Sequence, residues 1–267
     1  MRPLRGFTLI EMVMVIVLMG IIIAVIAPLA AQPFRAYQAS KDRAQLVSLA
    51  DQAFFLMQRD IHAALPNSIR VNSTGTAFEL IHVVSAGRYR AQDSGLTGSD
   101  TLDFTTADSS FQVAGPFTQP PAGSQLVIYH TGQTGADAYA GDAVITPAGT
   151  TLTVTNNNPE SLITLSSAHQ FPYPSPMQRF YVVDTPITYM CKNSQLWRYD
   201  QYSLQTTVAS PPPSARASLV SDQVGSCQFS YQPGTASRAG LISVQLVITG
   251  QNEQLSIMEQ ANVPNGI

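Results

Sequence analysis

The feature that most constrains the fold is an apolar run of 25 residues, from Phe7 to Ala31. Within this run 21 residues are apolar, and Glu11 is the only charged one. A helix rises ~1.5 Å per residue and the hydrocarbon core of a membrane is ~30 Å thick, so more than ~18 such residues predict a transmembrane helix. Arg2 and Arg5 precede the run and predict a cytoplasmic N-terminus with an exported remainder.

An ordinary secretory signal peptide is the alternative interpretation of this run. The apolar core of a signal peptide spans ~7–15 residues, and this run is longer. It also lacks a clear small-x-small cleavage site before Gln32. A carboxylate within a membrane segment is costly and tends to be functional, so Glu11 requires a specific explanation.

The segment GFTLIE at positions 6–11, followed by an apolar helix, resembles the class III signal of type IV pilins and type II secretion pseudopilins. The resemblance implies that a prepilin peptidase cleaves between Gly6 and Phe7 and methylates the new amine, so that Phe7 becomes N-methylphenylalanine. It implies that Glu11 pairs with the N-terminal amine of a neighbouring subunit and so fixes the register of assembly. It also places Pro28 where pilins have a helix-disrupting proline.

The helix pattern continues beyond the apolar run. Pro28 and Pro33 each remove a backbone donor, which predicts a kink or a loosened turn at each. Residues 7–65 therefore predict a broken helix of about 88 Å that ends at Pro66. Its second half has one apolar stripe at three- and four-residue spacing, made of Leu46, Leu49, Ala53, Leu56, Met57, Ile61, Ala64 and Leu65.

Four segments follow from this pattern and from the resemblance. Residues 1–6 are expected to be a leader peptide, 7–31 a membrane-spanning and filament-core helix, 32–66 an amphipathic helix, and 67–267 a β-rich globular head. Asp60 lies close to the apolar stripe, so we expect a packed neighbour or the Arg59 region to accommodate its charge.

The head is predicted to be β structure, because short segments rich in Val, Ile, Thr, Tyr and Phe alternate with Gly, Pro, Asn and Asp clusters. The fold class is α+β, with a long N-terminal helix packed on an antiparallel β head, type IV pilin-like. Two segments, 85–123 and 210–217, read as long loops. The predicted strands are Phe78–Val84, Thr101–Phe104, Gln125–His130, Thr151–Thr155, Leu162–Leu165, Arg179–Val183, Thr188–Cys191, Gln195–Tyr199, Cys227–Tyr231, Leu241–Ile248 and Gln254–Met258.

The chain contains two cysteines, Cys191 and Cys227. In an exported chain the favoured interpretation is a disulfide that closes the C-terminal region. A metal pair or two reactive thiols are less favoured, because no histidine lies near either cysteine. The absence of a Cys-x-x-Cys-His sequence excludes cytochrome attachment.

Further strings resemble the minor pilins of the MSHA (mannose-sensitive haemagglutinin) pilus. They are FPYPSP at 171–176, RFYVVDTPITYMC at 179–191, DIHAALPNSIR at 60–70, GRYR at 87–90 and NVP at 262–264. The resemblance implies a low-abundance subunit that helps to initiate or cap a pilus.

The implied partners are major and minor pilins, the prepilin peptidase, the inner-membrane assembly platform and the inner membrane itself. The implied location is a single-pass inner-membrane protein that later reaches the pilus surface. Alternatives are an adhesin whose loops 85–123 or 130–150 contact a surface, and a J-type pseudopilin of a secretion system. A membrane-anchored periplasmic enzyme is the least favoured alternative.

No other motif predicts a catalytic, metal or cofactor site. The net charge of −3 gives no general case for nucleic-acid binding, and only 12% of residues are charged. There is no Gly-x-Ser-x-Gly elbow, no phosphate-binding loop and no His-Glu-x-x-His pattern. Scattered histidines are expected to be structural, and acidic loop residues are expected to be solvated turn residues rather than calcium ligands. These residues are His62, His82, His130, His169, Asp93, Asp100, Asp103 and Asp108.

Overall fold

The structure is a computed structural model. It divides into two compact units, residues 1–48 and residues 49–267, which we describe separately. The helix α1 (Leu9–His62) contributes residues to both units. The described residues are 8–93, 99–157, 160–208, 212, 214–234, 238–251 and 253–263.

The first unit is helical from Leu9 onward. The helix is continuous through Pro28 and Pro33, so the expectation of a broken helix is wrong. Each proline removes one backbone donor, and the remaining hydrogen bonds of the neighbouring turns maintain the helix. A kink at either proline stays a prediction.

In the second unit the helix ends at His62, three residues before the predicted end. The residue before a proline is disfavoured in the α conformation, and Leu65 precedes Pro66. The chain instead pairs with a strand: the Leu65 N–H donates to the Ile81 carbonyl at 2.8 Å. The apolar stripe of this unit is buried as predicted, with Met57 and Ile61 each 1% exposed.

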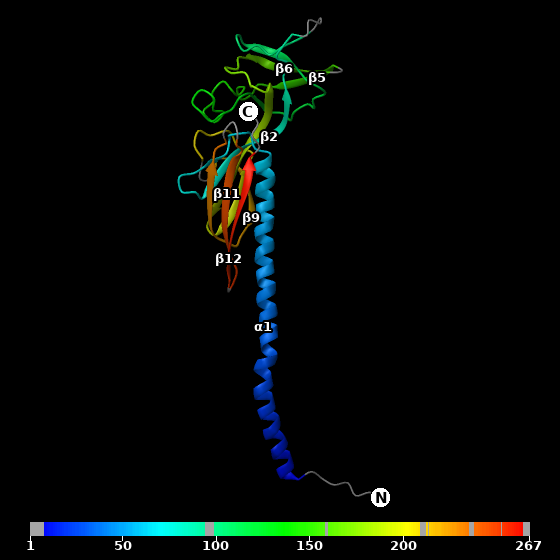
Figure 1. Cartoon of the computed structure of the whole chain (residues 1–267), viewed down its shortest axis with the longest axis vertical. Coiled ribbons are helices and arrows are strands. Elements are labelled where there is room, and N and C mark those ends of the chain that lie inside the picture. Colours follow the sequence, from blue (N-terminus) through cyan, green and yellow to red (C-terminus); the bar gives the residue numbers. More distant parts are fainter. Residues whose placement is uncertain are drawn as a thin grey trace. The chain divides into compact units, whose positions relative to one another are not determined.

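The described part of the head contains twelve strands, and the strand pairs within it are antiparallel. Together with α1 they form an α+β fold of the type IV pilin-like class, as predicted (Figure 1). The strands are β1 (Arg70–Val71), β2 (Ala77–Arg88), β3 (Asp108–Val113), β4 (Gln125–Val127), β5 (Leu152–Asn157), β6 (Glu160–His169), β7 (Arg179–Lys192), β8 (Gln195–Asp200), β9 (Arg216–Ser221), β10 (Val224–Gln232), β11 (Gly240–Thr249) and β12 (Gln254–Val263).

These strands form three sheets. The largest has the order β1-β2-β7-β8-β9, and β4 also pairs with β7. The other two have the orders β10-β11-β12 and β3-β6-β5. Figure 1 shows β5 and β6 at the opposite end of the head from β11 and β12, with β2 between them.

Strand β7 is one strand of 14 residues, where the sequence predicted two. The two predicted strands left residues 184–187 between them, a gap that contains Pro186. Pro186 pairs with Ile81, and between this pair and the pair Val83–Val183 the strand β7 has one residue more than β2. The bulge therefore lies in β7 beside the proline, and proline is tolerated in sheets at such irregularities. The bulge therefore lets the strand continue through the proline.

Four further expectations about strands are corrected. Thr101–Phe104 is not a strand, because the Asp103 carboxylate accepts hydrogen bonds from Thr105 and Thr106 and forms a turn. Segment 85–123 contains the end of β2 and all of β3, and the supposed loop at 210–217 contains the start of β9. The strand predicted at 125–130 stops at Val127, and Tyr129 adopts a positive φ of 59°.

Aromatic side chains connect the sheets of the head. The Phe78 ring on β2 stacks on Tyr189 with centroids 5.2 Å apart and meets Phe229 of β10 edge-on at 4.9 Å. Cys191 on β7 and Cys227 on β10 form a disulfide with their Cα atoms 6.3 Å apart. The small C-terminal sheet is thus joined to the main sheet by both packing and a covalent bond.

Candidate functional site

The start of α1 is closed by a hydrogen-bonded cap. The Thr8 N–H and hydroxyl donate to Glu11 Oε2 at 3.3 and 3.2 Å, and the Met12 N–H donates to the Thr8 carbonyl at 3.3 Å. This is one half of a capping box, in which the acidic side chain three positions into the helix accepts from the N–H of the capping residue. Gly6 and Phe7, the predicted cleavage and methylation sites, lie outside the described residues.

Sequence reasoning missed this local role of Glu11, although the Thr-x-x-Glu spacing is itself a signal for it. The cap leaves Glu11 exposed at the end of the unit. Its carboxylate lies beside Thr8, the second residue of the mature chain that the resemblance implies. Its pairing with a neighbouring subunit stays a prediction.

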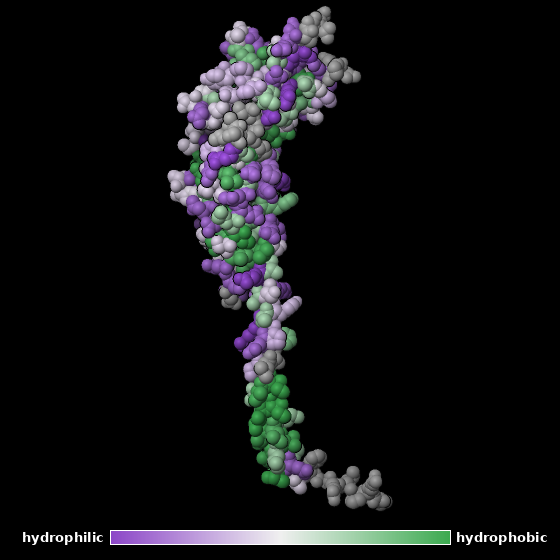
Figure 2. Space-filling view, viewed as in Figure 1, coloured by the Kyte–Doolittle hydropathy of each residue, from purple (hydrophilic) through white to green (hydrophobic). Residues whose placement is uncertain are grey.

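The apolar run of α1 presents large side chains to its surroundings. Every large apolar residue from Leu9 to Ile26 is at least 47% exposed in the structure. Figure 2 shows this stretch as a hydrophobic band along the helix. By length and composition, α1 is the one described helix that could cross a membrane. The segment fits a single-pass membrane anchor.

In the second unit, Asp60 ties the helix to the main sheet. Its carboxylate is buried and accepts hydrogen bonds from the Tyr189 hydroxyl at 2.8 Å and from Arg198 Nε at 2.6 Å. Arg59 also donates to it, at 3.0 and 3.1 Å. The expectation that a neighbour or Arg59 accommodates Asp60 is confirmed, and the principal partners come from β7 and β8.

The ion-pair network continues from Asp60 to β9. Arg198 also pairs with Asp200, and Arg216 of β9 donates to Asp200 at 2.7 and 2.8 Å. Burial alone would raise the pKa of Asp200, but the hydrogen bonds from Arg216 and Arg198 outweigh it and hold this pKa below its ordinary value. The network therefore connects the helix with two neighbouring strands.

A second network is built around Glu79, which is completely buried on β2. Arg70 Nε donates to its carboxylate at 2.6 Å, and so does the Tyr202 hydroxyl at 2.6 Å. Burial raises the pKa of Glu79, while the bonds from Tyr202 and Arg70 oppose that rise. The Arg70 guanidinium also lies over the Tyr139 ring, 3.5 Å from its centroid.

Sequence reasoning did not identify this network. A lone glutamate within the apolar strand FELI is the signal that could have pointed to it. Tyr202 could not be found in the same way, because it is 123 residues from Glu79 in the chain.

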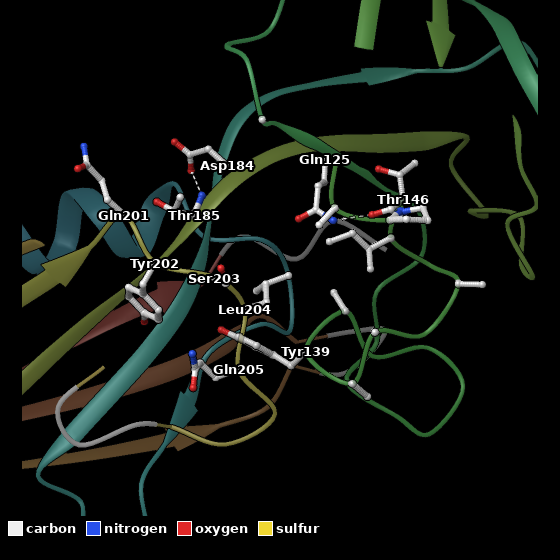
Figure 3. Close-up of a pocket in the computed structure, with 18 of the residues that line it drawn as sticks. Gln125, Tyr139, Thr146, Asp184, Thr185, Gln201, Tyr202, Ser203, Leu204 and Gln205 are labelled. Carbon is white, nitrogen blue, oxygen red and sulfur yellow. Dashed lines mark hydrogen bonds between the residues drawn. The ribbon is translucent and has the colours of Figure 1, made fainter. Parts of the chain in front are cut away.

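Beside this network lies a cavity of about 920 Å³ (Figure 3). Segment 138–148 forms one wall, and segment 201–205 after β8 forms another. The walls combine small apolar residues with the neutral side chains of Gln125, Thr146 and Gln205, and Asp184 is the one acidic residue lining it among those described. The lining of this cavity is therefore mostly uncharged.

Tyr139 separates this cavity from a smaller one of about 400 Å³, which it also lines together with His130 and Tyr231. The His130 Nε2 atom and the hydroxyls of Tyr139 and Tyr231 are buried without a hydrogen-bond partner among the described residues. The Ala138 N–H donates to His130 Nδ1 at 3.1 Å, so Nε2 carries the proton of the neutral ring. Burial lowers the pKa of His130 and favours that neutral form. These groups suit ordered water or a small polar ligand.

The described residues contain no group of three or more histidine, cysteine or acidic side chains that could hold a metal ion. His82 pairs with Asp184 at 2.8 Å, and His169 pairs with the Ala143 carbonyl at 2.8 Å. The aspartates weighed as calcium ligands do not assemble in this part of the chain; Asp108, for example, accepts from the Asp103 N–H at 3.0 Å.

Comparison with known proteins bears on the N-terminus. Residues 1–27 match the family model for the prokaryotic N-terminal methylation motif. A search of curated proteins and a search of solved structures found no match. The motif is carried by structural subunits rather than enzymes, and it implies processing by a prepilin peptidase and assembly with other pilins. Together with the capped apolar helix and the antiparallel β head, it supports a type IV pilin-like prepilin.

Proposed function

We propose that this chain is a minor pilin of a type IV pilus of the MSHA type, similar to the biogenesis protein MshO. A prepilin peptidase cleaves it between Gly6 and Phe7 and methylates Phe7. The mature subunit then takes part in the initiation of pilus assembly, at or near the tip. The match of residues 1–27 to the N-terminal methylation motif is the observation that supports the prepilin part of this proposal, and the MSHA assignment rests on the resemblance of strings such as FPYPSP at 171–176.

The N-terminal part of the described helix supports an assembly role. Before assembly, the exposed apolar stretch after Leu9 resides in the inner membrane, with the N-terminus cytoplasmic and the head periplasmic. In the pilus the same surface packs against the helices of other subunits. Glu11 gains the methylated amine of a neighbour as its partner, because a carboxylate in an apolar core needs a cation or a proton.

Mass spectrometry of the mature protein tests the processing step. We expect an N-terminal methylated Phe7 and no trace of residues 1–6. An intact Met1, or a cut near Gln32, would contradict the proposal and would favour a signal anchor or a signal peptide.

A substitution at Glu11 tests the assembly step. Glu11→Ala should leave cleavage after Gly6 intact and should reduce the amount of the subunit in sheared pili. Asp51→Ala, which removes an exposed carboxylate further along the same helix, is the matched control and should be incorporated normally. Equal incorporation of both variants would remove the proposed role of Glu11.

An adhesin is the second candidate function, and the cavity of about 920 Å³ in the head favours it. Ala148→Trp would place a large ring at the lining of this cavity. If the head binds a surface there, this variant should assemble into pili but lose adherence. Normal adherence would favour the assembly role alone.

A J-type pseudopilin is the related alternative on the same fold. Deletion of the gene should abolish piliation and leave protein secretion intact if the pilus assignment is right. The opposite outcome would assign the chain to a secretion system.

A further inference from the structure

Strand β12 forms an open edge of the head. It pairs with β11 along its whole length, from Gln254 opposite Thr249 to Val263 opposite Gly240. No other described strand pairs with it. Its opposite edge therefore presents backbone groups that no described residue satisfies.

The hydrogen-bond pattern shows which backbone groups these are. The Gly250 N–H donates to the Glu253 carbonyl at 2.8 Å, which makes these two residues a hydrogen-bonded pair. Antiparallel ladders alternate hydrogen-bonded and non-hydrogen-bonded pairs, so every second residue of β12 directs its N–H and C=O away from β11. These residues are Gln254, Ser256, Met258, Gln260 and Asn262, and all five are exposed.

Two other strand edges of the head are covered by hydrogen bonds. On β5, the Gln119 side chain donates to the Leu152 carbonyl at 2.7 Å and accepts from the Val154 N–H at 2.8 Å. On β4, the Leu126 carbonyl accepts from the Thr146 N–H at 2.9 Å. A side chain and a returning loop thus occupy positions that a partner strand would need.

Hydrogen bonds also cover the edges of two more strands. On β3, the Gln112 carbonyl accepts from the Arg90 N–H at 2.8 Å, and on β10 the Phe229 N–H donates to the Gly75 carbonyl at 2.7 Å. Strand β9 is also open among the described residues, but it is six residues long and begins with the charged Arg216. Strand β12 is ten residues long and is the longest open edge in the described head.

Natural proteins usually protect an edge of this length with lysine, proline, a bulge, an inward-pointing charge or a covering element. Strand β12 contains no lysine and no proline, its register with β11 has no shift, and Glu259 is its only charged residue. Met258 is 62% exposed at its centre. Glu259 lies opposite the buried Val244 and is the one inward-pointing charge on this edge, so the edge suits pairing with a strand of another chain that supplies a basic residue there.

We propose that β12 is an interface strand that pairs, edge to edge, with an extended strand of a different pilin subunit. The partner strand is uncharged apart from a lysine or arginine opposite Glu259. This inference rests on the proposed function, because it requires other pilins as neighbours. The backbone provides the affinity, and Glu259 provides the selectivity.

The charge of Glu259 argues against a second copy of this chain as the occupant. Two copies of β12 can pair antiparallel over nearly their full length. In that arrangement the inward-facing side chains of both copies lie on the same side of the joined sheet. Those registers place Glu259 directly opposite its copy or two residues away from it. Like charges at such positions destabilise a pair of strands, whereas a basic residue stabilises it. Glu259 has no ion-pair partner among the described residues, so it is available for one.

A matched pair of substitutions at Met258 tests the backbone contact. Met258→Pro removes an edge-directed N–H and leaves the ladder to β11 intact, and Met258→Ala removes the same side chain but keeps the N–H. The full-length variants are expressed in the pilus-forming strain, and the fraction in sheared pili is measured by immunoblot. We expect Met258→Ala to match the wild type and Met258→Pro to fall about tenfold. Equal incorporation of the two variants would overturn the proposal.

A second pair tests the charge and does not depend on proline. Glu259→Lys should lower incorporation clearly, and Gln245→Lys, which places the same charge on the central strand β11, should leave it unchanged. Equal effects of these two variants would also overturn the proposal. So would a dimer of the purified full chain in detergent that is lost in Met258→Pro, because it would identify a second copy as the occupant.

The wild type separates failure of this inference from failure of the proposed function. A wild-type chain that lacks methylated Phe7 or does not enter pili contradicts the proposed function and with it the edge pairing. A wild-type chain that enters pili, with Met258→Pro entering equally well, contradicts the edge pairing alone.

Discussion

Two stretches of α1 use apolar side chains in opposite ways. In the first, Met19 is 57% exposed, and its apolar neighbours are exposed on all sides of the helix. In the second, Met57 is 1% exposed, while Phe55, two residues earlier, is 68% exposed. The same secondary structure thus serves two environments. An all-round apolar helix needs a membrane or other helices as its surroundings, whereas a one-sided stripe needs a single sheet.

The comparison also distinguishes what each stretch needs for stability. The first stretch is held by its own backbone hydrogen bonds and the Thr8–Glu11 cap. The second is held by burial and by the ion pairs of Asp60. A substitution that destabilises the head should therefore lower the stability of the second stretch and leave the helicity of the first stretch unchanged.

Removal of the disulfide should have the largest effect. The double variant Cys191→Ser, Cys227→Ser loses a link across 36 residues, which the chain-entropy model values at about 3.8 kcal/mol. We expect the denaturation midpoint of the head to fall sharply in detergent while the helical circular-dichroism signal of the first stretch persists. If the helical signal is lost together with the tertiary signal of the head, the two stretches are not independent.

Asp60→Ala should have the next largest effect, about 3 kcal/mol, because it leaves the partly buried Arg198 with only one of its two acidic partners and removes the acceptor of the Tyr189 hydroxyl. The measurement is the denaturation midpoint of the full chain. Asp51→Ala, on the exposed side of the same helix, is the control and should change it little. Similar losses in both variants would mean that the ion pair does not anchor the helix.

A pair of methionine substitutions tests the comparison directly. Met57→Ala should destabilise the head by about 2 kcal/mol or more, since it removes a buried side chain and leaves a cavity. Met19→Ala should leave the stability of the head unchanged. The opposite pattern would show that the buried and exposed stretches have been assigned the wrong way round.

A pH dependence should have the smallest effect. The hydrogen bond to Asp184 raises the pKa of His82 above its ordinary value of 6.5. The pair therefore stabilises the head fully below pH 6.5, and this contribution is lost as the pH rises through the raised pKa. Because both side chains are partly exposed, we expect less than about 1 kcal/mol.

The measurement is the denaturation midpoint from pH 5.5 to 8.5 in the wild type and in Asp184→Asn. The difference between the two proteins should be largest at the acidic end and should vanish at the alkaline end. A constant difference would show that the pair does not titrate in this range.

The sequence predicted the parts of the structure that depend on local pattern. The apolar stripe through Met57 and Ile61 is confirmed, because helix periodicity places these residues on one face. The alternation in Leu241–Ile248 correctly predicts β11, with its even-numbered residues inward. The strand β7 was divided wrongly at Pro186, because the bulge beside the proline forms only when β7 pairs with β2, another part of the chain.

The candidate site likewise contains local features that the sequence predicts and long-range contacts that it does not. Thr8 and Glu11 carry a local signal, since a capping box depends only on residues three positions apart. The partners of Asp60 lie 129 and 138 residues away, and no local pattern identifies them. The cavity beside Tyr139 is formed by loops, and the sequence does not predict where these loops lie in the fold.

The sequence by itself determined the apolar N-terminal helix, the N-terminal methylation motif in residues 1–27, and the β character of the head, because each depends on residue types at short spacing. Only the tertiary structure decided which strands are neighbours, where Asp60 and Glu79 find their partners, and which edge is left open. Strand pairing joins residues that are distant in the chain, and its hydrogen bonds are made by the backbone, which is the same for nearly every residue type. The open edge of β12 is therefore a property of the fold, and its single charge, Glu259, is the part of it that the sequence specifies.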